Sequence, residues 1–179
     1  VFKSSDQGMS WTDISSNLPE RGSAYAIAED HVNPDLLFVG TEFSCFTSVD
    51  GGMHWKKLSA GLPTIAVRDI AIQKRENDLV LGTFGRGFYV LDDYSPLRAI
   101  TEEALMADAA IFPIKPGLLF IEARPLIYPG NGFMGHMFYS ADNPPVGATF
   151  TFYVKESVKT LRQERQEAER KLVKEGKDV

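Results

Sequence analysis

The stretch Ser48-Val49-Asp50-Gly51-Gly52-Met53-His54-Trp55 decides the fold, because four of its positions repeat an earlier stretch of the chain. The earlier copy reads Ser4-x-Asp6-x-Gly8-x-x-Trp11, so the pattern recurs at a spacing of 44 residues. We call residues 4–11 motif 1 and residues 48–55 motif 2. Each motif is followed by a similar tail, at residues 14–19 and 58–63. A fixed spacing with matching flanks is the signature of a repeat architecture.

Between and after the motifs, short apolar stretches alternate with turn residues, which is typical of β-strands. The first repeat has strands expected at residues 24–28, 36–41, 45–49 and 54–58. The order restarts with strands expected at residues 67–72, 79–83 and 88–91. Four strands in about 44 residues is the period of a β-propeller blade. The sequence therefore predicts an all-β fold that contains the last one to two blades of a partial β-propeller.

The residue types of the motif suit a tight hairpin between the third and fourth strands of a blade. The glycine permits the positive φ of the turn, and the aspartate can accept hydrogen bonds from backbone N–H groups of its own turn. The tryptophan supplies an apolar face that can anchor the hairpin to its blade. A calcium loop needs several closely spaced oxygen ligands, whereas this turn offers one carboxylate, so a structural role is favoured over a catalytic or calcium-binding one. The structural residues are Ser4, Asp6, Gly8 and Trp11 in motif 1, and Ser48, Asp50, Gly52 and Trp55 in motif 2.

These motifs resemble those of the Asp-box (BNR) repeat superfamily, which includes sialidases, xyloglucan-active hydrolases and the sortilin/Vps10 receptors. Residues 36–50 and 67–97 are most similar to the last blades of large bacterial proteins described as sortilin-like or as glycosyl hydrolase BNR-repeat proteins. Most of that likeness lies in Val67-Arg68-Asp69-Ile70 and in residues 77–87. A histidine often stands in that group where this chain has Phe84.

The resemblance covers residues 1–100 and, less closely, residues 140–156. It implies the propeller architecture and a secreted, periplasmic or cell-surface location. It does not imply one activity, because members of the superfamily do unrelated things.

Composition divides the chain into three parts. Residues 1–100 are expected to hold the C-terminal blades, and residues 101–147 a helical turn with a Pro/Gly-rich linker. Residues 148–179 are expected to begin a second, fibronectin-like β domain with a C-terminal helix.

Local patterns place the elements of the later parts. A short strand at residues 97–100 is expected to complete the last blade, and Thr101 is expected to cap a helical turn over residues 101–106. A β-rich alternation predicts a strand at residues 148–155. Residues 156–175 contain helix formers without Gly or Pro, which predicts a helix that ends at Gly176.

Charge and composition exclude several function classes. The net charge of −5 disfavours a nucleic-acid or anionic-membrane surface, and no apolar run approaches the length of a membrane span. Cys45 lies in an apolar strand, which favours a buried, inert thiol. Gly82-x-x-Gly85-x-Gly87 joins two strands and does not open a helix, so it indicates a hairpin and not a phosphate-binding loop. We predict no cofactor.

Candidate chemistry is incomplete in this chain. The three histidines lack the spacing of metal ligands, so no metal is predicted; they are His31, His54 and His136. Glycoside hydrolysis needs two carboxylates across a cleft, and Asp69 is the only placed candidate. A sialidase needs an arginine cluster for the substrate carboxylate, of which Arg68 and Arg86 are a beginning.

Two function classes therefore remain. The first is a non-catalytic propeller module that binds a protein, peptide or glycan, whose partners include the remaining blades of its parent chain. The alternative is a polysaccharide-directed glycoside hydrolase whose catalytic residues lie mostly outside residues 1–179. The first is favoured, because the clearest signals in the sequence are structural.

The direction of successive strands predicts where a ligand binds. Antiparallel strands alternate in direction, so the loops between second and third strands lie at the end opposite the two motifs, together with the connections between blades. Ligand contacts are predicted for Arg68, Asp69 and Arg86, surrounded by Tyr25, Glu42, Phe43 and Phe84. The alternative is that Arg68 or Arg86 pairs with an aspartate and only ties neighbouring blades together.

Overall fold

The computed structural model describes the chain except for residues 60, 118, 120, 122–145, 157–158 and 177–179. Its strands form four antiparallel sheets, and helices are few. The all-β class is thereby confirmed at the level of secondary structure.

The first large sheet contains four strands in the order β3-β4-β5-β6, each antiparallel to its neighbour. Three of them were predicted to within one residue at either end, and the fourth is shorter than predicted. The strands are β3 (Ala24–Glu29), β4 (Leu37–Thr41), β5 (Cys45–Ser48) and β6 (Lys56–Lys57).

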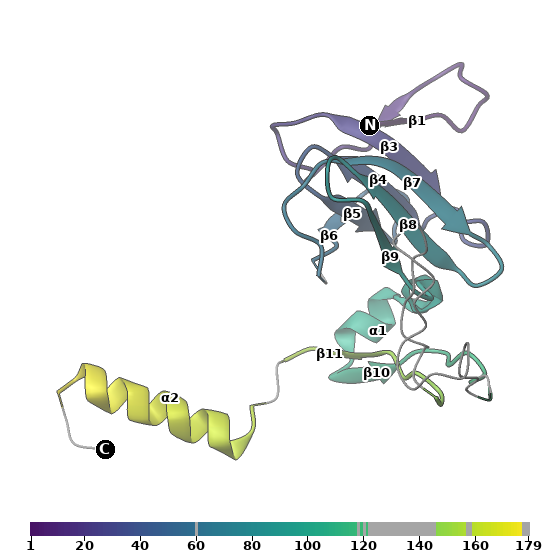
Figure 1. Cartoon of the computed structure of the whole chain (residues 1–179). Helices are drawn as coiled ribbons and strands as arrows, with labels where there is room; N and C mark the ends of the chain where they lie inside the picture. Colours follow the sequence, from purple (N-terminus) through teal and green to yellow (C-terminus); the bar gives the residue numbers. More distant parts are fainter. Residues whose placement is uncertain (60, 118, 120, 122–145, 157–158, 177–179) are drawn as a thin grey trace, which may run out of the picture.

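The second large sheet contains three strands in the order β7-β8-β9, again antiparallel. They are β7 (Val67–Gln73), β8 (Asp78–Thr83) and β9 (Phe88–Leu91). Strand β7 packs against β3 and β4, so the two sheets lie beside each other (Figure 1). The predicted strands of the second repeat are confirmed.

The 44-residue repeat is present in the strand pairing. Strands β1 (Phe2–Lys3) and β2 (Thr12–Asp13) pair in the register Phe2↔Asp13 and Lys3↔Thr12. Strands β5 and β6 pair in the register Phe46↔Lys57 and Thr47↔Lys56, which is the same register 44 positions later. The two motifs therefore close equivalent hairpins.

Each turn is held by its own serine and aspartate. In motif 1, the Ser4 hydroxyl accepts the Gly8 N–H at 2.7 Å, and Asp6 Oδ1 accepts the Ser10 N–H at 2.8 Å. In motif 2 the same two bonds measure 2.8 Å and 2.9 Å. The glycines adopt the positive φ that the turn requires, 90° at Gly8 and 97° at the equivalent position of motif 2. The hydrogen bonding expected of both aspartates is confirmed.

The two tryptophans differ, and this corrects the prediction that both are anchors. Trp55 is 2% exposed and packs with Leu37, Val39 and Phe46 of its own sheet. Trp11 is 62% exposed. The reason is that strand β4 and residues of the first tail both pack on Trp55, whereas the described residues place neither beside Trp11.

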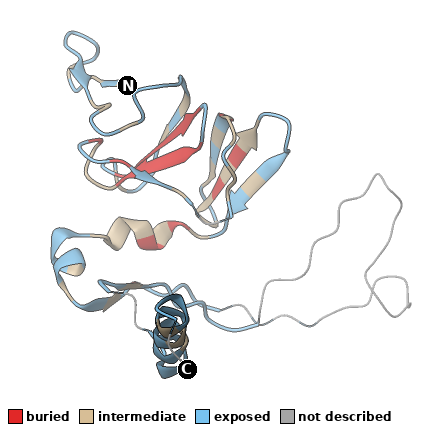
Figure 2. Cartoon of the chain, turned by 90° about the vertical axis from the view of Figure 1, so that its left-hand side faces the viewer, coloured by how far each residue is buried: buried red, intermediate tan, exposed pale blue. Residues whose placement is uncertain are grey.

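An apolar core fills the space between the large sheets, and Figure 2 shows burial concentrated in their strands. Its fully buried members include Phe38 and Cys45 from the first sheet and Val67 and Leu79 from the second. Burial raises the pKa of the Cys45 thiol to about 12, consistent with the inert cysteine that the sequence predicts.

The strand predicted at residues 97–100 is wrong. A 3₁₀ helix, η1 (Ser95–Ala99), occupies that place, with Pro96 in its first turn. Proline lacks the N–H that a strand ladder needs and is well suited to the start of a helix. The helical turn that follows, α1 (Glu102–Met106), is capped as predicted, because the Thr101 hydroxyl accepts the Ala104 N–H.

Helix η1 and the preceding Tyr94 connect the two sheets through Asp30, which is 3% exposed at the end of β3. The Arg98 guanidinium donates from Nε and from a terminal nitrogen to the two Asp30 carboxylate oxygens, each at 2.7 Å. The Tyr94 hydroxyl donates to the same carboxylate at 2.6 Å, and the N–H groups of Val32 and Asn33 also donate to it. We call Asp30, Tyr94 and Arg98 the Asp30 clamp.

Burial alone would raise the pKa of Asp30, but this effect is outweighed. The hydrogen bonds from Arg98, Tyr94 and the two backbone N–H groups hold the pKa of Asp30 well below its usual range. The carboxylate is therefore charged and fully partnered in the folded protein, which is the condition under which a buried charge is tolerated.

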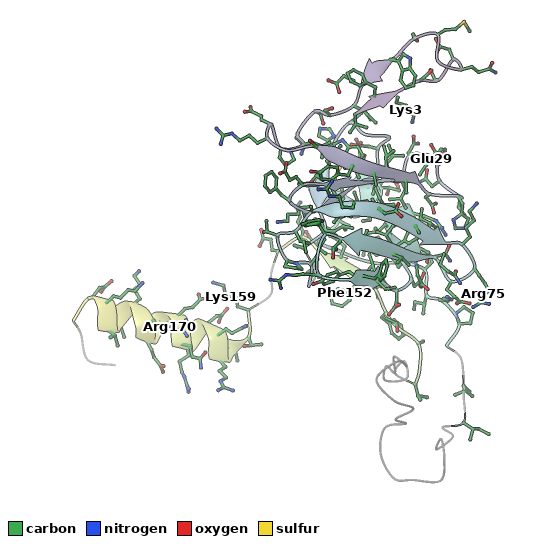
Figure 3. The ribbon with its side chains drawn as sticks, turned by 45° about the horizontal axis from the view of Figure 1, so that its top comes forward. Lys3, Glu29, Arg75, Phe152, Lys159 and Arg170 are labelled. Carbon is green, nitrogen blue, oxygen red and sulfur yellow. The ribbon has the colours of Figure 1, made fainter. Side chains whose placement is uncertain are left out.

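The C-terminal part contains one small sheet and one helix. Strand β10 (Ala109–Ile111) pairs with β11 (Phe152–Val154). Strand β11 lies within the strand expected at residues 148–155 but is shorter than predicted. Its partner β10 comes before the proline-rich stretch of the predicted linker. Helix α2 (Leu161–Lys174) begins later than predicted, at a capping box formed by Thr160 and Gln163. Figures 1 and 3 show α2 standing apart from the large sheets. Most of the predicted linker lies outside the described residues.

We predict that Arg98→Met destabilises the protein by about 3–5 kcal/mol, because it leaves a buried carboxylate without its charge partner. Arg75→Met is the matched control, since Arg75 pairs with Glu76 through a side chain that is 82% exposed, and it should change stability much less. Urea denaturation with unchanged m-values measures both. Equal losses in the two variants would refute the role of the clamp.

The pH dependence of unfolding tests the same carboxylate. Because its folded-state pKa is depressed, Asp30 contributes its full stabilisation above the unfolded-state pKa of about 3.9. That stabilisation is lost as the pH falls toward the folded-state pKa. The Arg98→Met protein should therefore lose less stability than the wild type between neutral pH and pH values below about 4.

A further prediction concerns the Asp6 carboxylate of motif 1. The Ser10 side chain and N–H, together with Ser4, lower the pKa of Asp6 to about 2. Ser10→Ala should raise that pKa toward 3.8 without reaching it, because the Ser10 N–H and the Ser4 hydroxyl still donate. Carboxyl-carbon NMR titration measures the pKa, and Ser5→Ala, which removes no hydrogen bond to Asp6, should leave it unchanged.

Candidate functional site

Both large sheets begin with a bulge, and each bulge carries one of the predicted ligand-site residues. The register between β3 and β4 shifts between Ala24 and Ala26, which leaves Tyr25 as the extra residue. The register between β7 and β8 shifts between Val67 and Asp69, which leaves Arg68 as the extra residue. A bulge redirects the side chain of the extra residue out of the regular alternation of the strand.

The two bulged residues meet. The guanidinium carbon of Arg68 lies 3.9 Å from the centre of the Tyr25 ring and 5.4 Å from the centre of the Phe84 ring. Both distances are within the range of cation–π attraction. Arg68 is nevertheless exposed, and Phe84 is 69% exposed, so the group is open to solvent. We call Tyr25, Arg68 and Phe84 the aromatic–arginine site.

Two hairpin tips border this site. In the β4–β5 turn, the N–H and hydroxyl of Thr41 both donate to the Ser44 carbonyl. In the β8–β9 turn, the N–H and hydroxyl of Thr83 both donate to the Gly87 carbonyl. Equivalent threonines thus close both tips in the same way.

The connection between the sheets joins these tips to each other. The Ile65 N–H donates to the Phe43 carbonyl at 3.2 Å, and the Phe84 N–H donates to the Ala66 carbonyl at 2.9 Å. Phe84 is therefore positioned by the segment that leads directly into Arg68. The site combines residues from both sheets and from the connection between them.

The aromatic–arginine site lies at the end of the sheets opposite motif 2, as strand direction predicts. The Gly51 N–H of motif 2 donates to the Asp35 carbonyl in the β3–β4 turn, which places these two turns together. Glu29, at the end of β3, and Arg75, in the β7–β8 turn, mark the same end in Figure 3. The strands are antiparallel, so the β4–β5 and β8–β9 tips lie at the other end.

The other residues predicted to contact a ligand lie at the same end of the sheets as the aromatic–arginine site, but they do not stack with its three residues. The Glu42 N–H donates to the Ser23 carbonyl, and the Phe43 ring packs over Gly22, where an added Cβ would lie 2.7 Å from it. Asp69 Oδ1 accepts the N–H of the next residue, Ile70. The Arg86 side chain is exposed on the β8–β9 tip.

Among the described residues, no carboxylate pairs with Arg68 or Arg86. The alternative in which one of them ties the blades together through an aspartate is therefore not what the described residues show. At the end of the sheets that carries Arg68, the two sheets meet through the stack of Arg68 on Tyr25. At the opposite end, they are connected by the ion pair of Arg98 and Asp30.

Other chemistry finds little support. The described residues contain no group of three or more His, Cys, Asp or Glu side chains that could hold a metal ion. Asp50 points into its own turn, where its carboxylate also contacts the His54 ring at 2.7 Å. Burial raises the pKa of Asp50, but its hydrogen bonds lower it by more, so the net shift is downward. A carboxylate held in this way is suited to a turn and not to proton donation.

Sequence reasoning missed two features. The bulges at Tyr25 and Arg68 have no residue signature, and the 44-residue spacing aligns Tyr25 with Asp69 instead of Arg68. The Asp30 clamp joins residues 68 positions apart, and no local pattern marks it.

Comparison with known proteins adds no assignment. No helix among the described residues is long and apolar enough to cross a membrane. No family model, no curated protein and no solved structure matches this chain.

Proposed function

We propose that this chain is part of a β-propeller built from Asp-box repeats and that it serves as a non-catalytic ligand-binding module. In this proposal it belongs to a secreted, periplasmic or surface protein of the sortilin-like kind, and it binds a protein, peptide or glycan. The 44-residue repeat in the strand register and the two equivalent hairpins support the propeller part of the proposal.

The observation that carries the binding role is the aromatic–arginine site. Arg68 is exposed, stacks on Tyr25 and has no carboxylate partner among the described residues. A guanidinium held against an aromatic ring keeps its edge donors available for planar acceptors, such as carboxylates, amides and sugar hydroxyls. The exposed rings beside it offer a surface for a sugar ring or an apolar side chain.

The backbone that carries the site is held in place without a ligand. Its three residues stand on two strands and one hairpin tip that backbone hydrogen bonds hold in place. A preorganised site binds more tightly, because less side-chain entropy is lost on association.

Glycoside hydrolysis remains the alternative activity, with catalytic residues mostly outside residues 1–179. It needs a second carboxylate facing Asp69, and no specific contact of Asp69 in the structure favours this role. The Asp69 carboxylate accepts a backbone N–H of its own strand.

Binding to arrayed polysaccharides and peptides tests the proposal. Arg68→Gln should weaken binding to any ligand found by about tenfold or more, the loss expected when a charged hydrogen-bonding group is removed from a contact. The melting temperature should change little, because an exposed cation–π contact contributes only about 0.5–1 kcal/mol. Arg75→Gln, at the opposite end of the sheets, is the charge-matched control and should bind like the wild type.

Two results would count against the binding role. One is an Arg68→Gln protein that melts several degrees lower but binds unchanged, which would make the stack purely structural. The other is release of reducing sugars from plant β-glucans that is lost in Asp69→Asn, which would favour the hydrolase.

A further inference from the structure

A segment of the first repeat covers the hairpin of motif 2 and shows which contacts such a hairpin can make. The Trp55 indole N–H donates to the Ile14 carbonyl at 2.7 Å. The Asn17 carboxamide bridges the Trp55 backbone, accepting its N–H at 2.7 Å and donating to its carbonyl at 2.9 Å. The Ser16 hydroxyl donates to the Met53 carbonyl at 2.7 Å. We call residues 14–18 the docking segment.

Apolar contacts accompany these hydrogen bonds. A Cβ added at Gly52 would lie 2.8 Å from Cδ1 of Ile14, so the isoleucine packs directly on the glycine of the turn. Ile14 and Leu18 both pack against the cluster that contains Trp55. The docking segment is uncharged, as this surface requires.

Motif 1 forms the same turn without the segment, and its hairpin stands in a two-stranded sheet without neighbours equivalent to β3 and β4. Trp11 and Phe2 are 62% and 63% exposed, where the equivalent Trp55 and Phe46 are 2% and 9% exposed. A Cβ added at Gly8 would meet only the Trp11 ring, at 3.9 Å, where the equivalent glycine of motif 2 meets Ile14. Within the described residues, the Trp11 indole N–H, backbone N–H and carbonyl form no hydrogen bond. The turn itself is complete, with the same hydrogen bonds as motif 2.

We propose that the β1–β2 hairpin, through Phe2, Gly8 and Trp11, binds a segment with the chemistry of residues 14–18, carried by a further repeat unit of the same kind. The required features are a branched apolar residue, an asparagine three positions later and a leucine after it. The asparagine bridges the Trp11 backbone, and the carbonyl of the branched residue accepts the indole N–H.

Both segments of this type within the chain are already engaged, which argues against a second copy of the chain as the occupant. Residues 14–18 cover Trp55. The equivalent tail has Gly61 where the docking segment has Asn17, so it lacks the bridging carboxamide. Its leucines, Leu58 and Leu62, pack on the core between the large sheets. The inference rests on the proposed repeat architecture, but it is independent of the ligand role, because motif 1 lies outside the aromatic–arginine site.

The two tryptophans of the chain provide the readout. A synthetic peptide with the sequence Thr-Asp-Ile-Ser-Ser-Asn-Leu-Pro, that of residues 12–19, is titrated into the full chain while tryptophan emission and acrylamide quenching are followed. Trp55 is already buried, so the signal comes from Trp11. We expect a saturable shift of emission to shorter wavelength and reduced quenching of one tryptophan.

A matched peptide with leucine in place of the asparagine should bind at least about tenfold more weakly, because two hydrogen bonds are lost. Trp11→Ala in the full chain should abolish the response. This variant should leave the fold intact, since Trp11 is exposed and outside both buried clusters.

Several results would overturn the inference. They are the absence of a saturable change, equal binding of the two peptides, and binding that survives Trp11→Ala. Trp11-dependent self-association in sedimentation that the peptide does not displace would identify a second copy as the occupant and would equally contradict it.

Discussion

The buried carboxylate of Asp30 is the interaction on which the arrangement of the two large sheets depends. Asp30 follows the first strand of one sheet, and Arg98 follows the last strand of the other. The two Asp30 carboxylate oxygens accept hydrogen bonds from Nε and from a terminal nitrogen of Arg98. Arg98 also donates to the Asn77 side chain at 2.8 Å, at the turn before β8. A buried charge is costly unless each of its oxygens is partnered, so the sheets are restricted to the one orientation in which all these donors reach it.

This restriction has an effect at the opposite end of the sheets. The contact between Tyr25 and Arg68 joins the same two sheets, but an exposed cation–π pair contributes only about 0.5–1 kcal/mol. It is too weak to hold the sheets in position by itself. The Asp30 clamp and the apolar core around Phe38 and Leu79 hold the two sheets in position instead. The aromatic–arginine site is thus a product of packing elsewhere, and its residues are not needed to hold the two sheets together.

The repeat made much of the fold predictable, because turn chemistry and strand alternation are local. Motifs 1 and 2, the long strands and the Thr101 cap needed only nearby residues. The strand at residues 97–100 failed because Pro96 outweighed an apolar stretch. The late start of α2 followed from Thr160, whose capping box was not recognised. The clamp could not be foreseen, since Asp30 and Arg98 meet only after both sheets have formed. The end of the sheets that carries the site followed from strand direction, but the stack within it depended on two bulges.

The two hairpin tips beside the site differ in length, and this has a consequence for how such repeats diverge. The turn closed by Thr83 is one residue longer than that closed by Thr41, and it contains Gly85 and Gly87 at positive φ. No atom lies within 4 Å of a Cβ built at either glycine, so the longer tip extends into open space. A side chain or an extra residue at this tip would meet solvent and not the core. Units with the same strand frame can therefore differ in the length and residues of this tip.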